Sequence, residues 1–165
     1  MKVTGKAVKF GDNVDTDVII PSKYLVYTDP AKLGEHAMEG VDPDFSRKSR
    51  EGVVIVAGRN FGCGSSREQA PIALKNSHVK CVLAESFARI FFRNAINVGL
   101  PVLECKGLSE KIEEGDMVTV ELETGRVEVP SKGIVLYGTR IPKFILEILL
   151  DGGLVEHIRK RRVSR

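Results

Sequence analysis

The sequence has few cysteines and no long apolar run. Its three cysteines stand at positions 63, 81 and 105 of 165 residues, and no two of them form a CxxC pair. This sparse set argues against a disulfide framework, a zinc site or a self-contained iron–sulfur site. No apolar run approaches the ~20 residues of a membrane span, and residues 1–5 open no signal peptide. We therefore expect a cytoplasmic protein with no membrane partner and no metal ligands of its own.

Basic residues are in excess only at the C-terminal end. Five of the 25 Lys and Arg occupy the last seven positions. The other 20 are fewer than the 22 Asp and Glu, so the body of the chain is slightly acidic. These five are Arg159, Lys160, Arg161, Arg162 and Arg165. No aromatic residue interleaves with them and no nucleic-acid motif accompanies them. We expect a solvated or subunit-contacting tail and no nucleic-acid binding.

The composition is that of an ordinary globular protein, with 42% hydrophobic and 28% charged residues, and the length predicts a single domain over residues 1–165. Apolar runs at 53–57, 79–84 and 101–105 predict buried strands. Helix-compatible segments at 65–76 and 87–97 separate them. This strand–helix alternation predicts a small parallel sheet with right-handed crossovers.

The two ends of the chain have other patterns. Residues 1–50 are strand-poor: Val3–Phe10 alternates weakly, Val18–Ile20 is a short β-branched strand ended by Pro21, and Thr28–Lys48 is a polar loop with a functional or covering role. Alternation at 118–122 and 127–129 around a Thr-Gly turn predicts an antiparallel hairpin.

A last helix follows the hairpin. Apolar residues recur at helical spacing over residues 141–149, and a Gly-Gly pair at 152–153 ends the helix. The predicted fold class is α/β, a small parallel sheet flanked by helices with additional antiparallel strands.

The most informative segment is the glycine–serine turn from Gly58 to Glu68, between a buried strand and a helix. In α/β proteins ligands bind beyond the carboxyl ends of such strands. Glycines at 62 and 64 allow positive φ and close approach of a ligand. Ser65 or Ser66 is a good N-cap, and the sequence does not decide between them. Arg67 and free N–H groups suit an anion, while Pro71 favours a late helix start.

Five interpretations of this turn compete. A P-loop fails because no Gly-Lys-Ser/Thr follows, and a dinucleotide site fails because the glycines are not in GxGxxG order. A Cys63 nucleophile needs a histidine partner, and the three histidines (36, 78 and 157) lie in no recognisable motif. Carboxylate binding and a capped helix without a ligand both stay open on the residues alone.

Three ordered blocks carry a family resemblance. GCGSSREQAP at 62–71 occurs with DNVDTDVIIP at 12–21 and SFARIFFRNA at 86–95, the last followed by GLP at 99–101. Together they resemble the small swivelling domain of the aconitase superfamily over essentially the whole chain. A freestanding domain of this length is similar to the small subunits of isopropylmalate isomerases. The resemblance implies an aconitase-type swivelling β/β/α domain.

The resemblance also implies chemistry. Members of the family are hydro-lyases, and the small subunit is active only with a large subunit that carries a [4Fe–4S] cluster; this chain then binds none. Ser65 is the implied base that removes a proton beside a carboxylate. Ser66 and Arg67, with Gly64, are implied ligands of the substrate carboxylate. Asp15 and Asp17 have an implied structural or orienting role, and Cys63 is expected to be a small packed side chain.

The implied specificity loop follows Pro21 and consists of Tyr24, Leu25, Val26, Tyr27 and Thr28. Family members that act on tricarboxylates, such as homoaconitases, have an arginine in this loop, and this sequence has none. Apolar side chains fit an alkyl group and leave a third carboxylate unpaired. The small hydroxy-dicarboxylate expected is therefore isopropylmalate, in leucine biosynthesis, with 2-methylmalate (citramalate) second.

Two alternatives stay open. One is a homoaconitase small subunit, because the Lys23 side chain can pair with the third carboxylate of a tricarboxylate substrate. A non-catalytic carboxylate-binding domain is the other alternative, since fold alone never proves function. The sequence does not decide whether the isolated chain self-associates into a homo-oligomer.

Overall fold

The computed structural model describes residues 1–163, so Arg165 of the basic tail lies outside it. One seven-stranded sheet has the order β4-β3-β2-β1-β5-β6-β7. Its strands are β1 (Lys2–Lys9), β2 (Val53–Ala57), β3 (Val79–Ala84), β4 (Val102–Glu104), β5 (Met117–Glu121), β6 (Arg126–Val129) and β7 (Ile134–Tyr137). The first four are parallel and the last three pair antiparallel, which confirms the predicted fold class.

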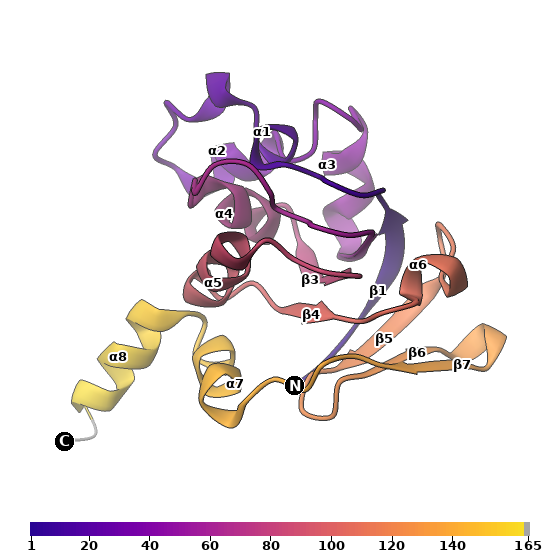
Figure 1. Cartoon of the computed structure of the whole chain (residues 1–165). Helices are drawn as coiled ribbons and strands as arrows, with labels where there is room; N and C mark the ends of the chain where they lie inside the picture. The colour runs from indigo at the N-terminus through magenta and orange to yellow at the C-terminus, as the bar shows by residue number, and fades with distance from the viewer. Residues whose placement is uncertain (164–165) are drawn as a thin grey trace.

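Eight α-helices and three short 3-10 helices (η) are described between and after the strands (Figure 1). They are α1 (Thr16–Ile19), η1 (Ser22–Tyr24), α2 (Pro30–Glu35), α3 (Phe45–Lys48), η2 (Ser49–Glu51), α4 (Gln69–Asn76), α5 (Arg89–Val98), α6 (Leu108–Lys111), η3 (Pro130–Lys132), α7 (Lys143–Leu150) and α8 (Leu154–Val163). Helix α4 packs against α1, α2 and α5, whereas α7 and α8 pack against α5. None of the helices in this part of the chain is long and apolar enough to cross a membrane.

The chain after β7 contacts the opposite edge strand of the sheet. The N–H of Thr139, just after β7, donates to the carbonyl of Glu104 in β4 over 2.8 Å. A Cβ on Gly138 would lie 2.5 Å from that same carbonyl oxygen, so glycine permits the contact. This backbone contact links the antiparallel part of the sheet to the end of the parallel part.

The N-terminal fifty residues correct two predictions and sharpen a third. The weakly alternating segment forms β1, which lies in the middle of the sheet and is the one strand described in these fifty residues. Val18–Ile20 is not a strand: α1 occupies Thr16–Ile19, because the Asp15 carboxylate accepts the Val18 N–H at 3.0 Å and caps that turn. A local cap here outweighs β-branched propensity.

The polar stretch 28–48 is also not a loop. It contains α2 and α3, and it buries Leu33, Met38 and Phe45 against the core. These apolar side chains are sparse in the sequence, so they give too weak a period for a helix prediction. The segment is therefore helical in two places and is not an irregular loop throughout.

Elsewhere the sequence predictions fare better. Strands at 53–57 and 79–84 are confirmed residue for residue, and every residue of β2 is buried. The hairpin and the helix ending at the Gly-Gly pair are confirmed as β5–β6 and α7. β7 was not predicted, and the described part of the basic tail forms helix α8.

Candidate functional site

The glycine–serine turn and the N-terminal segment before α1 are joined by backbone hydrogen bonds. The Gly62 N–H donates to the Val14 carbonyl over 2.7 Å, and the Thr16 N–H donates to the Cys63 carbonyl over 2.8 Å. Asp15 and Cys63 form an isolated parallel bridge between the two segments. In Figure 1, α1 lies beside α4 in the upper part of the molecule. The two sequence blocks are thus one structural unit.

Two glycines shape the turn. Gly62 has φ +83°, and a Cβ there would lie 2.1 Å from a ring carbon of buried Phe91. Gly64 has φ +99°, and its Cβ would meet Thr16 Oγ1 at 3.3 Å. The first glycine is required by packing as well as by backbone conformation, and the second mainly by conformation.

The Ser65 hydroxyl lies between two polar partners. Its Oγ is 3.1 Å from Thr16 Oγ1, and Arg67 Nε donates to it over 3.1 Å. The Ser65 N–H also donates to Thr16 Oγ1, at 3.2 Å. Thr16 is buried and Ser65 is exposed, so a buried hydroxyl fixes the orientation of an accessible one.

The Arg67 guanidinium is held on one side and open on the other. Its Nη1 pairs with Asp17 Oδ1 at 2.6 Å and donates to the Ile20 carbonyl at 3.1 Å. Within residues 1–163, no hydrogen bond is recorded for Nη2. The Arg67 side chain is only 17% exposed, whereas that of Asp17 is 66% exposed. This arrangement leaves a fixed cationic donor beside Ser65, suited to a carboxylate.

Backbone donors surround this pair. Gly64 and Ser66 belong to the exposed part of the turn, and neither N–H has a hydrogen-bond partner within the described chain. The Asn94 side-chain amide donates to the Ser66 carbonyl over 3.3 Å, which ties α5 to the turn. All three sequence blocks therefore meet here, around N–H groups that suit an anion.

The capping prediction for this turn was wrong. Helix α4 begins at Gln69, its N-cap is Glu68, and no side chain caps it. Ser65 is engaged with Thr16 and Arg67 instead, which keeps its hydroxyl away from the helix N–H groups. The late helix start expected from Pro71 is confirmed, with Pro71 in the first turn.

The loop after Pro21 lies next to this unit along the chain. Pro21 directly follows Ile20, whose carbonyl accepts a hydrogen bond from Arg67. Val26 is 79% exposed and Leu25 is half-buried against the core. No hydrogen bond or ring contact in the described residues joins Tyr24–Thr28 to the serine turn. Lys23 Nζ lies 5.1 Å from the centre of the Tyr24 ring.

The cysteines do not gather into a ligand set. Burial, and then the nearby Asp15 carboxylate, raise the pKa of the half-buried Cys63 thiol. Burial also raises the pKa of Cys81 well above its ordinary value and that of Cys105 to about 11. Across residues 1–163, no group of three or more His, Cys, Asp or Glu side chains is placed to hold a metal ion. These residues do not fit an iron–sulfur cluster.

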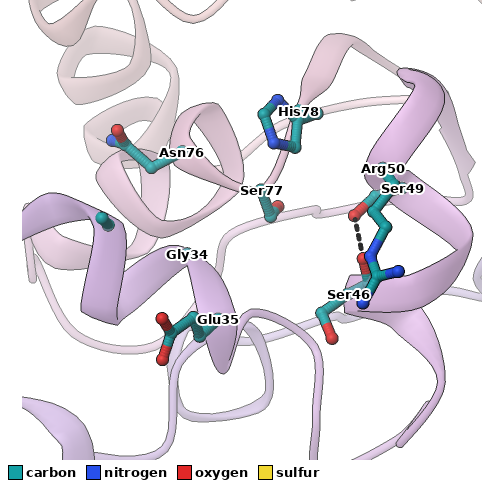
Figure 2. A pocket seen from close by; sticks show the side chains of 9 residues that line it. Gly34, Glu35, Ser46, Ser49, Arg50, Asn76, Ser77 and His78 are labelled. Atoms are coloured by element: carbon teal, nitrogen blue, oxygen red, sulfur yellow. Dashed lines mark hydrogen bonds between the residues drawn. The ribbon is translucent and has the colours of Figure 1, made fainter.

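A separate hollow of about 300 Å³ lies at the other end of α4 (Figure 2). Asn76, Ser77 and His78 line it from one side, facing Ser46, Ser49 and Arg50. The buried Ser49 hydroxyl donates to the Ser46 carbonyl and that of Ser77 to Leu74. None of the residues predicted from the sequence lines this hollow, and its charges are mixed.

Sequence reasoning missed two members of the candidate site. Thr16 stands in the block at 12–21, but nothing in a single sequence marks its hydroxyl as a partner of Ser65, 49 positions away. Asn94 lies in a predicted helix, and no sequence signal links it to the turn. Arg89 and Arg93, four positions apart in α5, are both exposed, as is usual for surface arginines.

Comparison with known proteins decides the family. A model of the aconitase C-terminal domain matches residues 34–107. The chain is 56% identical over 159 residues to the 3-isopropylmalate dehydratase small subunit of Halothermothrix orenii, covering 96% of each chain. The chain belongs to the family of 3-isopropylmalate dehydratase small subunits.

Two further relatives agree with this assignment. An isopropylmalate/citramalate isomerase small subunit of Methanocaldococcus jannaschii is 56% identical over 96% of this chain and 95% of its own. A crystal structure of 3-isopropylmalate dehydratase from M. jannaschii superposes with a TM-score of 0.93 at 48% identity, covering 99% of this chain and 97% of the other. The expected resemblance to the aconitase superfamily is thereby confirmed, and membership in a small-subunit family implies a large-subunit partner.

Proposed function

We propose that this chain is the catalytic small subunit of a 3-isopropylmalate dehydratase, a hydro-lyase of leucine biosynthesis. The reaction interconverts 2-isopropylmalate and 3-isopropylmalate by loss and re-addition of water through 2-isopropylmaleate. One observation carries the proposal: an exposed Ser65 hydroxyl is fixed between buried Thr16 and the Arg67 guanidinium. Family membership supplies the reaction in which such a hydroxyl acts.

Ser65 is the proposed base. A serine hydroxyl is a poor base unless its alkoxide is stabilised, and a cation and directed donors supply that stabilisation. Arg67 Nε already donates to Ser65 Oγ, and the Thr16 hydroxyl is placed to donate as well. The Ser65 alkoxide removes the proton from the carbon beside a carboxylate as hydroxide departs from the adjacent carbon. In the rehydration, hydroxide adds to the carbon that lost the proton, and the Ser65 hydroxyl returns its proton to the carbon that lost the hydroxide.

Arg67, Ser66 and Gly64 are the proposed holders of the substrate carboxylate. Arg67 Nη2 and the exposed N–H groups of Gly64 and Ser66 form a donor set for two oxygens. Asp17 fixes the guanidinium through Nη1, and Asp15 supports the unit by capping α1. The aspartates thus orient the site rather than touch the reacting carbon.

The metal chemistry belongs, in this proposal, to the large subunit. A [4Fe–4S] cluster held there supplies Lewis-acid chemistry for the hydroxyl that departs. This chain contributes no ligand to it, in keeping with the separation of its cysteines. The free thiols Cys81 and Cys105 suit the reducing cytoplasm, where we place the enzyme.

The substrate side group is proposed to face the loop Tyr24–Thr28. The segment from Pro21 to Thr28 has no arginine, and Leu25 and Val26 offer apolar surface to an alkyl group. A relative named for both isopropylmalate and citramalate supports 2-methylmalate as a second substrate. A homoaconitase-type tricarboxylate would leave a carboxylate without a partner other than Lys23.

The test is reconstitution with a cluster-bearing large subunit. The complex should convert isopropylmalate, convert methylmalate less well and leave homoaconitate nearly unchanged, while either chain alone is inactive. A complex that assembles, retains its cluster and converts none of the three would favour a non-catalytic carboxylate-binding domain. Anaerobic reconstitution that places a stoichiometric cluster on this chain alone would overturn the division between subunits.

A further inference from the structure

A carboxylate ties two aromatic side chains together at the base of the loop. The Tyr24 hydroxyl donates to Glu39 Oε1 over 2.6 Å, and His36 Nδ1 lies 2.5 Å from Glu39 Oε2. The bond to Tyr24, followed by the one to His36, lowers the pKa of the Glu39 carboxyl. Both oxygens of one carboxylate are therefore occupied by the same cluster.

The rings of this cluster are stacked. The centroids of Tyr24 and His36 lie 3.8 Å apart with an interplanar angle of 4°. Tyr27 continues the stack, with its centroid 6.3 Å from that of Tyr24 and 6.1 Å from that of His36. Tyr24 and Tyr27, which flank Leu25 and Val26 in the loop, thus both pack beside the His36 imidazole.

His36 and Glu39 are attached to well-packed parts of the chain. His36 ends α2, and Glu39 follows Met38, which is fully buried. The Met38 N–H donates to the Ile19 carbonyl over 2.8 Å, next to Ile20, whose carbonyl binds Arg67. The carboxylate is therefore anchored to the same segment that holds the arginine of the candidate site.

The loop makes few other contacts with the rest of the described chain. Its backbone hydrogen bonds are all local. They run from Tyr24 to Pro21, from Leu25 to Ser22 and from Tyr27 to Tyr24. Apart from apolar packing of Tyr24 and Leu25 against the core, the described contacts that connect it to the rest of the chain run through Glu39 and His36. Removing one carboxylate should release the loop without disturbing the fold.

We propose that Glu39 and His36, acting through Tyr24, are positioning residues that set where Leu25 and Val26 meet the substrate's alkyl group. This inference rests on the proposed function and deepens it, because it names what fixes the specificity loop. The cluster touches no reacting atom. Its loss should therefore change KM and substrate choice much more than kcat.

The first arm of the test needs only the full chain. Trypsin cleaves after Lys23, an exposed residue at the start of the loop, and mass spectrometry follows that one cut. Glu39→Gln and Tyr24→Phe should each speed this cleavage about tenfold, since each removes a hydrogen bond to a charged group. Glu35→Gln, an exposed carboxylate in α2 with no recorded bond, is the matched control and should cleave like the parent.

The second arm uses the assembled enzyme. Both variants should raise KM for isopropylmalate several-fold, keep kcat within about twofold, and narrow the preference for isopropylmalate over methylmalate. The double variant should be no worse than the worse single one, because both changes break the same contact. Near-additive effects would show that the two residues act separately and would overturn the inference.

The remaining outcomes are distinct. Unchanged cleavage in Glu39→Gln would overturn the inference whatever the kinetics. Faster cleavage with unchanged KM and substrate ratio would overturn it too, while parent activity still upheld the proposed function. A parent complex inactive on every substrate would overturn both, and only that result touches the proposed function.

Discussion

The serine turn and the loop Tyr24–Thr28 are held in place in opposite ways. The turn is fixed by backbone hydrogen bonds to Val14 and Thr16 and by a glycine packed against Phe91. The loop is fixed by side chains, chiefly one carboxylate and a stack of rings. The backbone contacts of the turn require glycine at 62 and 64, whereas the loop depends on a few side-chain contacts that single substitutions remove. In the proposed function, proton transfer relies on the first kind of support and selectivity on the second.

The largest effect is expected at the rigid turn. Ser65→Ala should lower kcat of the assembled enzyme by roughly 10²–10⁴-fold, the range for loss of a general base. Folding should be nearly unchanged, because Ser65 is exposed and caps no helix. Ser66→Ala is the neighbouring control, and it should act mainly through KM. Near-normal turnover of an assembled Ser65→Ala enzyme would remove Ser65 from its proposed role.

The packing of the turn can be broken with a single methyl group. Gly62→Ala puts a Cβ 2.1 Å from the Phe91 ring at φ +83°, and should lower the free energy of unfolding by about 3 kcal/mol. Gly64→Ala meets its nearest atom at 3.3 Å and should cost about 1 kcal/mol, from conformation alone. Urea denaturation of both variants measures the difference. Equal losses would mean that the contact with Phe91 does not hold the turn.

The loop should tolerate a change that the turn does not. Val26 is 79% exposed, so Val26→Arg should leave the unfolding free energy within about 0.5 kcal/mol of the parent. It should shift relative kcat/KM about tenfold from isopropylmalate toward homoaconitate-type substrates, since arginine pairs with a distal carboxylate and opposes an alkyl group. An unchanged ratio, with Leu25→Arg and Tyr27→Arg equally silent, would separate the loop from the substrate's side group.

The same contrast explains what the sequence could predict. β2 and β3 are continuous apolar runs, and such runs depend on burial alone, so both were predicted to the residue. Val18–Ile20 was wrongly predicted as a strand because its conformation depends on the Asp15 cap, a single hydrogen bond that outweighs the strand propensity of these residues. β7 lies at a sheet edge with weak alternation, and its place depends on pairing with β6 and on the bond from Thr139, after β7, to Glu104 of β4.

The candidate site was predictable only in part, for the same reason. Ser65 and Arg67 stand in a recognisable block, but their partners Thr16 and Asp17 come from a segment about 50 positions away. The Glu39 cluster escaped entirely, because Tyr24, His36 and Glu39 have no regular spacing. Side-chain contacts between irregular segments leave no periodic pattern in a single sequence.

The smallest expected effect is a pH-dependent change in the free energy of unfolding when Glu39, the carboxylate that holds the loop, is replaced. The pKa of Glu39 is lowered from the ordinary value of 4.5 by Tyr24 and then His36, with a minor contribution from Lys23. A group whose pKa is lower in the folded state stabilises the fold above its ordinary pKa, and that contribution is lost as the pH falls through the lowered value. Glu39→Gln should therefore be less stable than the parent near pH 7, and the difference should shrink below about pH 4.5 as Glu39 of the parent becomes neutral. Urea denaturation from pH 3 to pH 7 measures it, with Glu35→Gln as the control that shows no such trend. A difference that stayed constant with pH would mean that the charge of Glu39 does not hold Tyr24 and His36, and that shape alone orders the loop.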